Sequence, residues 1–220
     1  MAARYVAIIM DGNARWARER GLDVLEGHRE GAQALKRIVR EAVDLGIREL
    51  TVYAFSTENW TRPAAEVEGL MALFASLIHS ETPELEEQGV RMRFTGRRAE
   101  VSDQLRDRME WAEGRTAGNE RMTLFVAFNY GGRAEILDAA EAYVGGGDAA
   151  FQQLLYAPEM THPELLIRTS GERRLSNFLL WQCAYAELVF SDALWPDFTR
   201  ADLEAALDDF AARERRFGAR

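Results

Sequence analysis

Cysteine is almost absent from this sequence, because Cys183 is the single one among 220 residues. A lone cysteine cannot form a disulfide within one chain, and such sparing use is typical of proteins in a reducing cytosol. Cys183 lies in the apolar stretch 179–185, where a small buried thiol is more common than a reactive one. The sequence therefore excludes an internal disulfide framework and predicts a buried thiol.

Long apolar runs are missing as well. No stretch approaches the roughly 20 apolar residues that span a bilayer as a helix. The N-terminus also lacks a basic region followed by an apolar stretch and a cleavage site. We therefore expect a cytoplasmic protein that contacts a membrane at most peripherally.

An excess of positive charge is the third absence. The formal net charge is −9, which argues against a nucleic-acid-binding protein because affinity for a phosphate backbone rests on basic surface. Any anion site must then be local. Arginine suits bidentate contact with phosphate oxygens, although each cluster taken alone is more often a solvated face. The sequence gathers arginine in three places: Arg15 and Arg18; Arg168, Arg173 and Arg174; and Arg213, Arg215 and Arg216.

Linkers and internal repeats are absent too, so we interpret residues 1–220 as one domain. Amphipathic helices alternate with apolar runs typical of strands at 5–10, 49–55, 90–95, 122–130, 165–167 and 188–190. This alternation predicts an α/β fold with a central, mostly parallel sheet surrounded by helices. We expect Pro83 to bend or break the helix that carries the apolar stripe 67–78, and 145–148 to be a loop.

Polar segments follow three of these strands, at 11–18, 56–63 and 168–177. In a parallel sheet all three lie at the edge where ligands bind. Gly12 lets the backbone approach a ligand closely, and the next residues can start a helix whose free N–H groups favour an anion. Asp11 beside such a pocket indicates a divalent cation on a phosphorylated substrate. The alternative for Asp11 taken alone is that it caps a helix.

Five ordered motifs carry a resemblance that covers nearly the whole chain. They are residues 6–13 (VAIIMDGN), 53–60 (YAFSTENW), 129–133 (NYGGR), 168–172 (RTSGE), and 195–198 (WPDF) with 215–218 (RRFG). Together they resemble the cis-prenyltransferases, and most closely the bacterial undecaprenyl diphosphate synthases. The resemblance implies an enzyme that condenses isopentenyl diphosphate with an allylic diphosphate, usually farnesyl diphosphate. It also implies Mg2+, a homodimer, and a hydrophobic tunnel between sheet and helices for the growing chain.

The resemblance also assigns roles to residues. Asp11 is expected to be catalytic and to bind the metal, with Glu187 as a second metal-linked carboxylate, and Asn59 is expected to be catalytic. An amide is a weak base, so we assign Asn59 to orientation, with the final proton passing to a diphosphate oxygen or water. The expected substrate-binding residues are Gly12, Asn13, Ala14, Arg15, Trp16, His28, Ser56, Thr57, Glu58, Trp60, Arg62, Arg168, Arg174, Leu175 and Ser176. Arg216 and Gly218 are expected to reach the homoallylic site of a neighbouring subunit.

The expected tunnel residues are Ala54, Leu70 and Phe74. Each added isoprene unit buries more hydrocarbon, so extension stays favourable until side chains obstruct the tail. Short-chain members of the family tend to carry a bulkier residue than Ala54, so we expect a medium-chain product such as undecaprenyl or decaprenyl diphosphate, a cell-wall lipid carrier. Members of the family commonly carry Gly where this chain has Ala14, and Arg where it has Val24. The change from Arg to Val24 removes a cation from the expected allylic site.

Three alternatives stay open. A short-chain cis-prenyl diphosphate synthase would share the motifs. A catalytically silent prenyltransferase subunit would be expected to lose Asp11, Asn13 or the 168–176 segment, and this chain keeps them all. A nucleotide-binding domain would need a Gly-x-Gly-x-x-Gly turn or a Gly-Lys-Ser/Thr loop, and neither is present.

Overall fold

A six-stranded parallel sheet organises the part of the chain that the computed structural model describes, residues 3–213. The order across the sheet is β3-β4-β2-β1-β5-β6. Every pairing is parallel, which confirms the predicted α/β class. The strands are β1 (Tyr5–Ile9), β2 (Glu49–Ser56), β3 (Val90–Thr95), β4 (Met122–Tyr130), β5 (Leu165–Arg168) and β6 (Glu187–Phe190).

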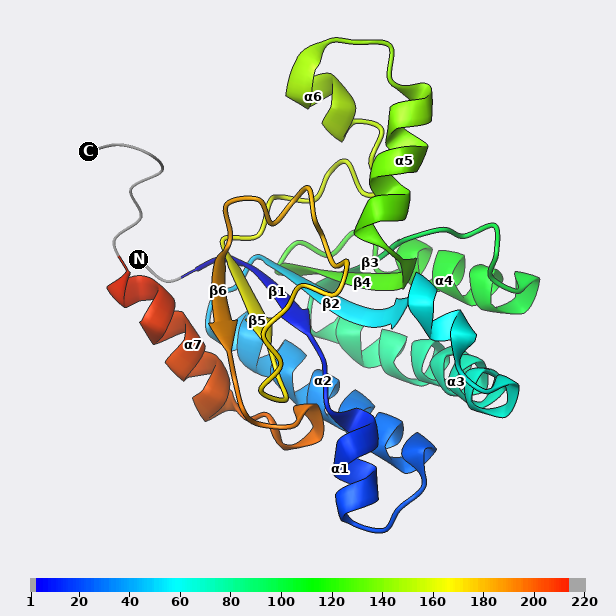
Figure 1. Ribbon diagram of the computed structural model, residues 1–220, viewed down its shortest axis with the longest axis vertical. Helices are drawn as coiled ribbons and strands as arrows, with labels where there is room; N and C mark the ends of the chain where they lie inside the picture. Colours follow the sequence, from blue (N-terminus) through cyan, green and yellow to red (C-terminus); the bar gives the residue numbers. More distant parts are fainter. Residues whose placement is uncertain (1–2, 214–220) are drawn as a thin grey trace.

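Helices cover one face of this sheet, and irregular chain covers much of the other (Figure 1). The covering helices are α2 (Val24–Asp44), α3 (Ala64–Glu87), α4 (Asp103–Arg115) and α7 (Arg200–Ala212). Helices α5 (Gly132–Ala142) and α6 (Gly147–Gln152) project away from the sheet. The short elements α1 (Asn13–Glu19), η1 (Thr57–Thr61) and η2 (Trp195–Asp197) follow or face strand ends. None of the helices within residues 3–213 is long and apolar enough to cross a bilayer.

Burial on both faces explains the continuous apolar run of β1. Val6 and Ile8 pack into the core under the helices, whereas Ala7 and Ile9 pack into a second core. Cys183 belongs to this second core, where burial raises the pKa of its thiol to about 12. The predicted buried, unreactive thiol is confirmed.

Of the bend or break expected at Pro83, the structure excludes the break, and the loop expected at 145–148 needs correction. Helix α3 continues through Pro83 to Glu87, although proline removes one backbone hydrogen bond. Thr82 is fully buried and its hydroxyl donates to the Ile78 carbonyl at 2.5 Å, and Leu85 packs into the core. Packing therefore holds the last turn of α3 in place. The correction at 145–148 is that Gly147 starts the short helix α6, where we expected only a loop.

Strand β1 lies between β2 and β5, and the chain leaves it toward β2 but returns much later to β5. The two connections diverge here, and a crevice forms at the carboxyl ends of the strands on either side of such a switch point. Asp11, Ser56 and Arg168 lie at or just beyond the ends of these three strands. The topology therefore brings the three predicted polar segments to one edge.

Candidate active site

The backbone of Asp11 is held by the side chain of Thr169, the residue after β5. The Asp11 N–H donates to Thr169 Oγ1 at 2.8 Å, and that hydroxyl donates to the Asp11 carbonyl at 2.7 Å. Gly12 then turns the chain into α1 with a φ of 109°, a left-handed conformation that favours glycine. A Cβ at this position would also lie 2.9 Å from Leu194 Cδ2. Asp11 therefore sits on a tightly specified turn.

Arg168 joins the Asp11 carboxylate to the loop after β5. Its guanidinium donates to Asp11 Oδ2 and to Ser176 Oγ, each at 2.7 Å, although the residue is only 3% exposed. A buried cation requires such partners. The hydrogen bond to the Arg174 carbonyl adds a third contact and fixes the loop that carries Ser176.

Two more arginines meet at Glu172. Arg15 donates to the Ser170 carbonyl at 3.0 Å and contacts Glu172 at 3.3 Å, while Arg174 pairs with the other oxygen of Glu172. Both arginine side chains are about half exposed. They are therefore positioned to exchange a carboxylate partner for an incoming anion.

His28 lies inside α2 and faces the same cavity. Burial, and secondarily the nearby charge of Arg62, lowers the pKa of His28 to about 4. The imidazole is therefore neutral near pH 7. Its Nε2 atom is buried and has no hydrogen-bond partner among residues 3–213.

The polar segment after β2 forms a second wall of the cavity. Asn59 Oδ1 accepts from the Ser56 N–H at 3.0 Å as part of a capping box that starts η1. Glu58 accepts from Asn177 Nδ2 at 2.8 Å, and Asn177 also accepts from the Arg133 N–H. Asn177 thereby ties three separate segments together at the edge of the sheet.

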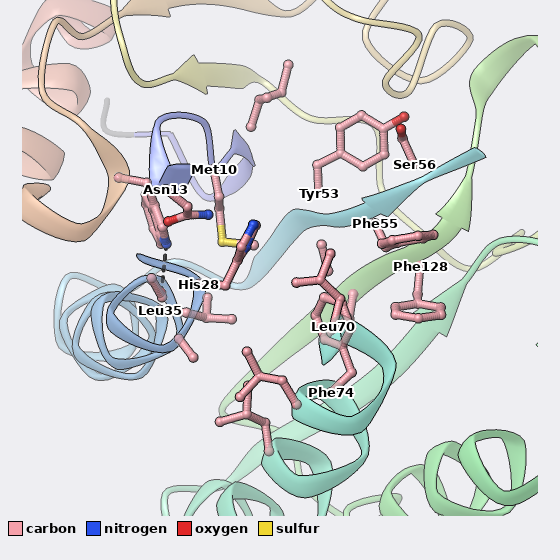
Figure 2. Close-up of a pocket in the computed structure, with 18 of the residues that line it drawn as sticks. Met10, Asn13, His28, Leu35, Tyr53, Phe55, Ser56, Leu70, Phe74 and Phe128 are labelled. Atoms are coloured by element: carbon pink, nitrogen blue, oxygen red, sulfur yellow. Dashed lines mark hydrogen bonds between the residues drawn. The ribbon is translucent and has the colours of Figure 1, made fainter. Parts of the chain in front are cut away.

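A cavity of about 700 Å³ connects these polar groups to the space between the sheet and helices α2 and α3. Core voids are normally about the size of a water molecule, so this space is a binding cavity and not a packing fault. Figure 2 shows Asn13 and His28 near one side and Leu70, Phe74 and Phe128 along the apolar part. Thirteen predicted residues line this cavity: Asp11, Asn13, His28, Ala54, Ser56, Glu58, Asn59, Arg62, Leu70, Phe74, Arg168, Arg174 and Ser176.

Other predicted residues lie outside the lining. Trp16 donates from Nε1 to Asp197 at 2.8 Å and stacks against Arg20. Trp60 donates to Asn129 at 2.7 Å, and Leu175 packs on the second core. Gly12, Ala14 and Thr57 lie next to lining residues along the chain, and Arg15 lies two residues after the lining residue Asn13. Arg216 and Gly218 lie outside the described residues.

Glu187 does not lie beside Asp11 in this chain. It starts β6 opposite Leu165, whereas Arg168 at the far end of β5 pairs with Ile9, two residues before Asp11. Its carboxylate is bound at 3.0 Å by Arg213. Three residues of strand separate the two ends by roughly 10 Å, so Asp11 and Glu187 of one chain do not face a common metal position.

Val24, where the family commonly has Arg, begins α2 behind the N-cap Asp23. Of Arg18, Arg20 and Arg29, which could supply that charge instead, Arg20 pairs with Asp197 and Arg29 pairs with Glu26.

The sequence interpretation missed two positioning residues, Thr169 and Asn177. Both lie within the polar segment 168–177, so the signal was present, but their partners Asp11 and Glu58 are more than 100 residues away in sequence. It also missed a charged cluster, Lys36, Glu81 and Glu84, which lines the other end of the cavity. In the sequence these residues have the pattern of ordinary charged side chains on the solvated face of a helix.

Within the described part of the chain, four buried polar atoms around the cavity mouth lack a hydrogen-bond partner: Asn13 Oδ1, His28 Nε2, Arg168 Nε and Ser170 Oγ. Unsatisfied buried polar atoms are costly and uncommon, so their clustering indicates a polar ligand. Mg2+ usually takes one or two carboxylates together with substrate phosphate oxygens and water. Within residues 3–213 no cluster of three or more His, Cys, Asp or Glu could hold a metal ion. The donor set fits an ion that Asp11 shares with a bound diphosphate.

A polar mouth rich in arginine that opens into a long apolar cavity defines a protein that handles anions with hydrocarbon tails. Over residues 9–218 the chain matches the sequence profile of the undecaprenyl diphosphate synthase family of prenyltransferases. It belongs to this family.

Similar sequences span almost the whole chain. Isoprenyl transferase of Thermotoga maritima is 49% identical over 224 residues, covering 98% of this chain and 96% of that protein. A ditrans,polycis-undecaprenyl-diphosphate synthase ((2E,6E)-farnesyl-diphosphate specific) of Pseudomonas aeruginosa is 47% identical, covering 98% and 90%. These relatives confirm the family resemblance of the motifs.

Two solved structures share the fold. Lavandulyl diphosphate synthase from Lavandula x intermedia, in complex with dimethylallyl diphosphate, superposes with a TM-score of 0.93 at 38% identity, covering 99% of this chain and 98% of that chain. A "probable undecaprenyl diphosphate synthase" from Campylobacter jejuni gives a TM-score of 0.85 at 29% identity, with 99% of each chain covered.

Proposed function

We propose that the protein is a cis-prenyltransferase that condenses isopentenyl diphosphate with farnesyl diphosphate to give a medium-chain polyprenyl diphosphate. The observation that carries this proposal is the single cavity that joins the Asp11–Arg168 mouth to an apolar space between the sheet, α2 and α3. A diphosphate head fits the mouth and a growing hydrocarbon tail fits the apolar space.

The chemistry explains the residue types. The allylic carbon–oxygen bond breaks and its electron pair leaves with the diphosphate, while the double bond of isopentenyl diphosphate supplies the electrons of the new carbon–carbon bond. A proton then passes from the extended chain to a diphosphate oxygen or to water. Donors that bind more strongly as the leaving diphosphate gains charge lower the barrier. Arg168, which binds Asp11, and Arg15 and Arg174, which meet at Glu172, are such donors, and they also offset the repulsion between two anionic substrates.

The proposal includes Mg2+ held by Asp11 and the bound diphosphate. When bound, such an ion would supply Lewis-acid stabilisation of the leaving diphosphate. Asn59 acts as an orienting residue in this proposal. Its side-chain oxygen is already an acceptor within the η1 capping box, which supports a role in holding the second wall and not in removing a proton.

The proposal also includes a homodimer in the cytoplasm, with a role in supplying a cell-wall lipid carrier. Helix α5 projects from the body (Figure 1), and apolar side chains on it and after it are exposed, including Leu137 at 63% and Val144 at 100%. Exposed apolar surface of this kind favours association with another protein surface. The single buried cysteine fits a reducing compartment.

A short-chain synthase is the second candidate, because the similar lavandulyl diphosphate synthase is, by name, an enzyme for a different prenyl product. The extent of the cavity favours the longer product, because its apolar lining includes Leu85 and Met92 as well as Phe74.

Purified protein incubated with Mg2+, isopentenyl diphosphate and farnesyl diphosphate tests the proposal. We expect medium-chain products of about ten or eleven isoprene units after removal of the diphosphate, because tail burial continues to favour extension. Chromatography that finds extension stopping after one condensation, at twenty carbons, would support the short-chain candidate. No condensation in the presence of Mg2+ would contradict both.

A further inference from the structure

The far end of the cavity is charged, although the walls that lead to it are apolar. Lys36 on α2 and Glu81 and Glu84 on α3 line the same cavity as Asp11 and Arg168. The deep walls beside them consist of apolar side chains such as Leu85, Met92 and Phe94. Nothing in the proposed chemistry of the mouth uses these charges.

The three residues form a bridge between the two helices. Lys36 Nζ lies 2.7 Å from Glu81 Oε2 and 2.7 Å from Glu84 Oε2. Glu84 also binds Arg40 and accepts from Gln88 Nε2 at 2.9 Å. These contacts raise the pKa of Lys36, through Glu81 first and Glu84 second, so the lysine stays charged.

The bridge also reaches the protein surface. The side chains of Lys36, Glu81 and Glu84 are 28%, 25% and 32% exposed. They therefore separate the apolar cavity from water along the seam between α2 and α3. One face of the bridge meets the cavity and the other is solvated.

A hydrocarbon tail that grows toward this bridge meets a different boundary from the rest of the wall. Apolar side chains such as Met92 can change rotamer around a tail without losing hydration. Charged side chains covered by hydrocarbon lose water without gaining a new partner, which is unfavourable. If the tail instead passed between them into solvent, it would lose the free energy gained by burying apolar surface.

We propose that the Lys36–Glu81–Glu84 bridge closes the far end of the tunnel and limits the length of the polyprenyl product. This inference rests on the proposed prenyltransferase function and adds a specificity-determining feature to it. Growth stops when the tail reaches the bridge, because the next isoprene unit can no longer be buried against apolar surface.

The test is the double variant Lys36→Met/Glu81→Met, which replaces charge by apolar side chains on both helices and leaves Glu84 paired with Arg40. We expect the product distribution to shift longer by roughly one isoprene unit or more, because more apolar surface is available to the tail. The rate of the first condensation onto farnesyl diphosphate should stay unchanged, since the mouth is not altered.

Two control variants accompany the test. Lys36→Arg keeps a cation in the bridge and should give the parent distribution. Glu86→Met removes a charge from the same helix, where Glu86 pairs with Arg115 and does not line the cavity, and should also leave the products unchanged. Thermal unfolding establishes that each variant is folded. If the double variant does not fold, Lys36→Met alone carries the same expected shift.

Unchanged or shorter products from a folded variant overturn the proposed role of the bridge while leaving the proposed function intact. A parent protein that forms no polyprenyl product overturns the proposed function, and the role of the bridge with it.

Discussion

Arg168 is the residue on which the mouth depends, because its buried charge is balanced by Asp11. Removal of one partner from a buried ion pair leaves the other charge uncompensated and is destabilising. Replacement of Asp11 by alanine would therefore mix a loss of stability with any loss of chemistry. Asparagine is the cleaner substitution, since its amide oxygen can still accept from Arg168.

We predict that Asp11→Asn lowers turnover by roughly 10^3-fold or more, because a neutral amide is a poor ligand for Mg2+. The free energy of unfolding should fall by less than about 2 kcal/mol, since the hydrogen bond from Arg168 is kept. Steady-state kinetics and urea unfolding check the two expectations. Activity within tenfold of the parent would contradict the proposed metal-binding role of Asp11.

His28 makes stability depend on pH. Its pKa is about 4 in the folded protein, because burial disfavours the charged imidazolium, and about 6.5 in the unfolded chain. Below pH 6.5 the unfolded chain binds a proton that the folded protein does not. Stability is therefore lost as pH falls from about 6.5 to about 4, by up to about 3 kcal/mol.

The variant His28→Gln should remove this component. We expect the difference in unfolding free energy between variant and parent to move in favour of the variant when urea unfolding is measured at pH 5 instead of pH 7.5. The exposed His79, which packs on Trp111, supplies the matched control variant His79→Gln. A variant with the same pH dependence as the parent would show that His28 is not the group responsible.

At the scale of elements, close packing of α1 on α2 positions Asn13. Gly27 and Gly31 on α2 both face this residue. A Cβ on Gly31 would lie 2.3 Å from Asn13 Oδ1 and 3.1 Å from Trp195 Cδ1, so a side chain there must displace Asn13. The two small residues thus set how near α2 approaches the anion-binding turn.

We predict that Gly31→Ala lowers kcat/KM for farnesyl diphosphate by about tenfold or more, because Asn13 is pushed from its place at the mouth, and costs about 1–3 kcal/mol of stability through overpacking. Gly114→Ala is the control, since that helical glycine has open space around it. It should stabilise the protein by about 0.5 kcal/mol through helix propensity alone. An unchanged kcat/KM for farnesyl diphosphate in Gly31→Ala would contradict the proposed substrate-binding role of Asn13.

At the scale of the whole molecule, α5 and α6 project from the body of the protein, away from the sheet (Figure 1). Leu137 on this projection is 63% exposed, so a change there alters little within the chain itself. The C-terminal end of the described chain, at Arg213, is bound to Glu187 at the opposite edge of the sheet from Asp11. The exposed apolar surface of the projection favours contact with another copy of the chain.

We predict that Leu137→Asp converts the proposed homodimer into a monomer at micromolar concentration, because a charge at an apolar interface must be desolvated. Sedimentation of parent and variant measures the outcome. Leu22→Asp is the control, because Leu22 is also apolar and exposed, at 45%, but lies in the turn between α1 and α2. A parent that sediments as a monomer would contradict the dimer.

The sequence by itself determined the class of fold and the edge that carries the site. Apolar runs such as 5–10 and 122–130 predicted the strands because burial on both faces of a parallel sheet needs continuous apolar residues. Parallel strands place their carboxyl ends together, so Asp11, Ser56 and Arg168 were correctly expected at one edge. Local pattern suffices for these features because each depends on near neighbours and on sheet direction.

Only the tertiary structure decided which distant groups meet. Glu187 stands 19 residues after Arg168 in sequence, but the loop between them reverses through left-handed residues at Ser176 and Asn177 and returns the chain to the other edge. The helix through Pro83 and the Lys36 bridge to Glu81 likewise depend on packing between α2, α3 and the sheet. Such contacts are set by the register of elements far apart in the chain, which residue periodicity within a single segment does not encode.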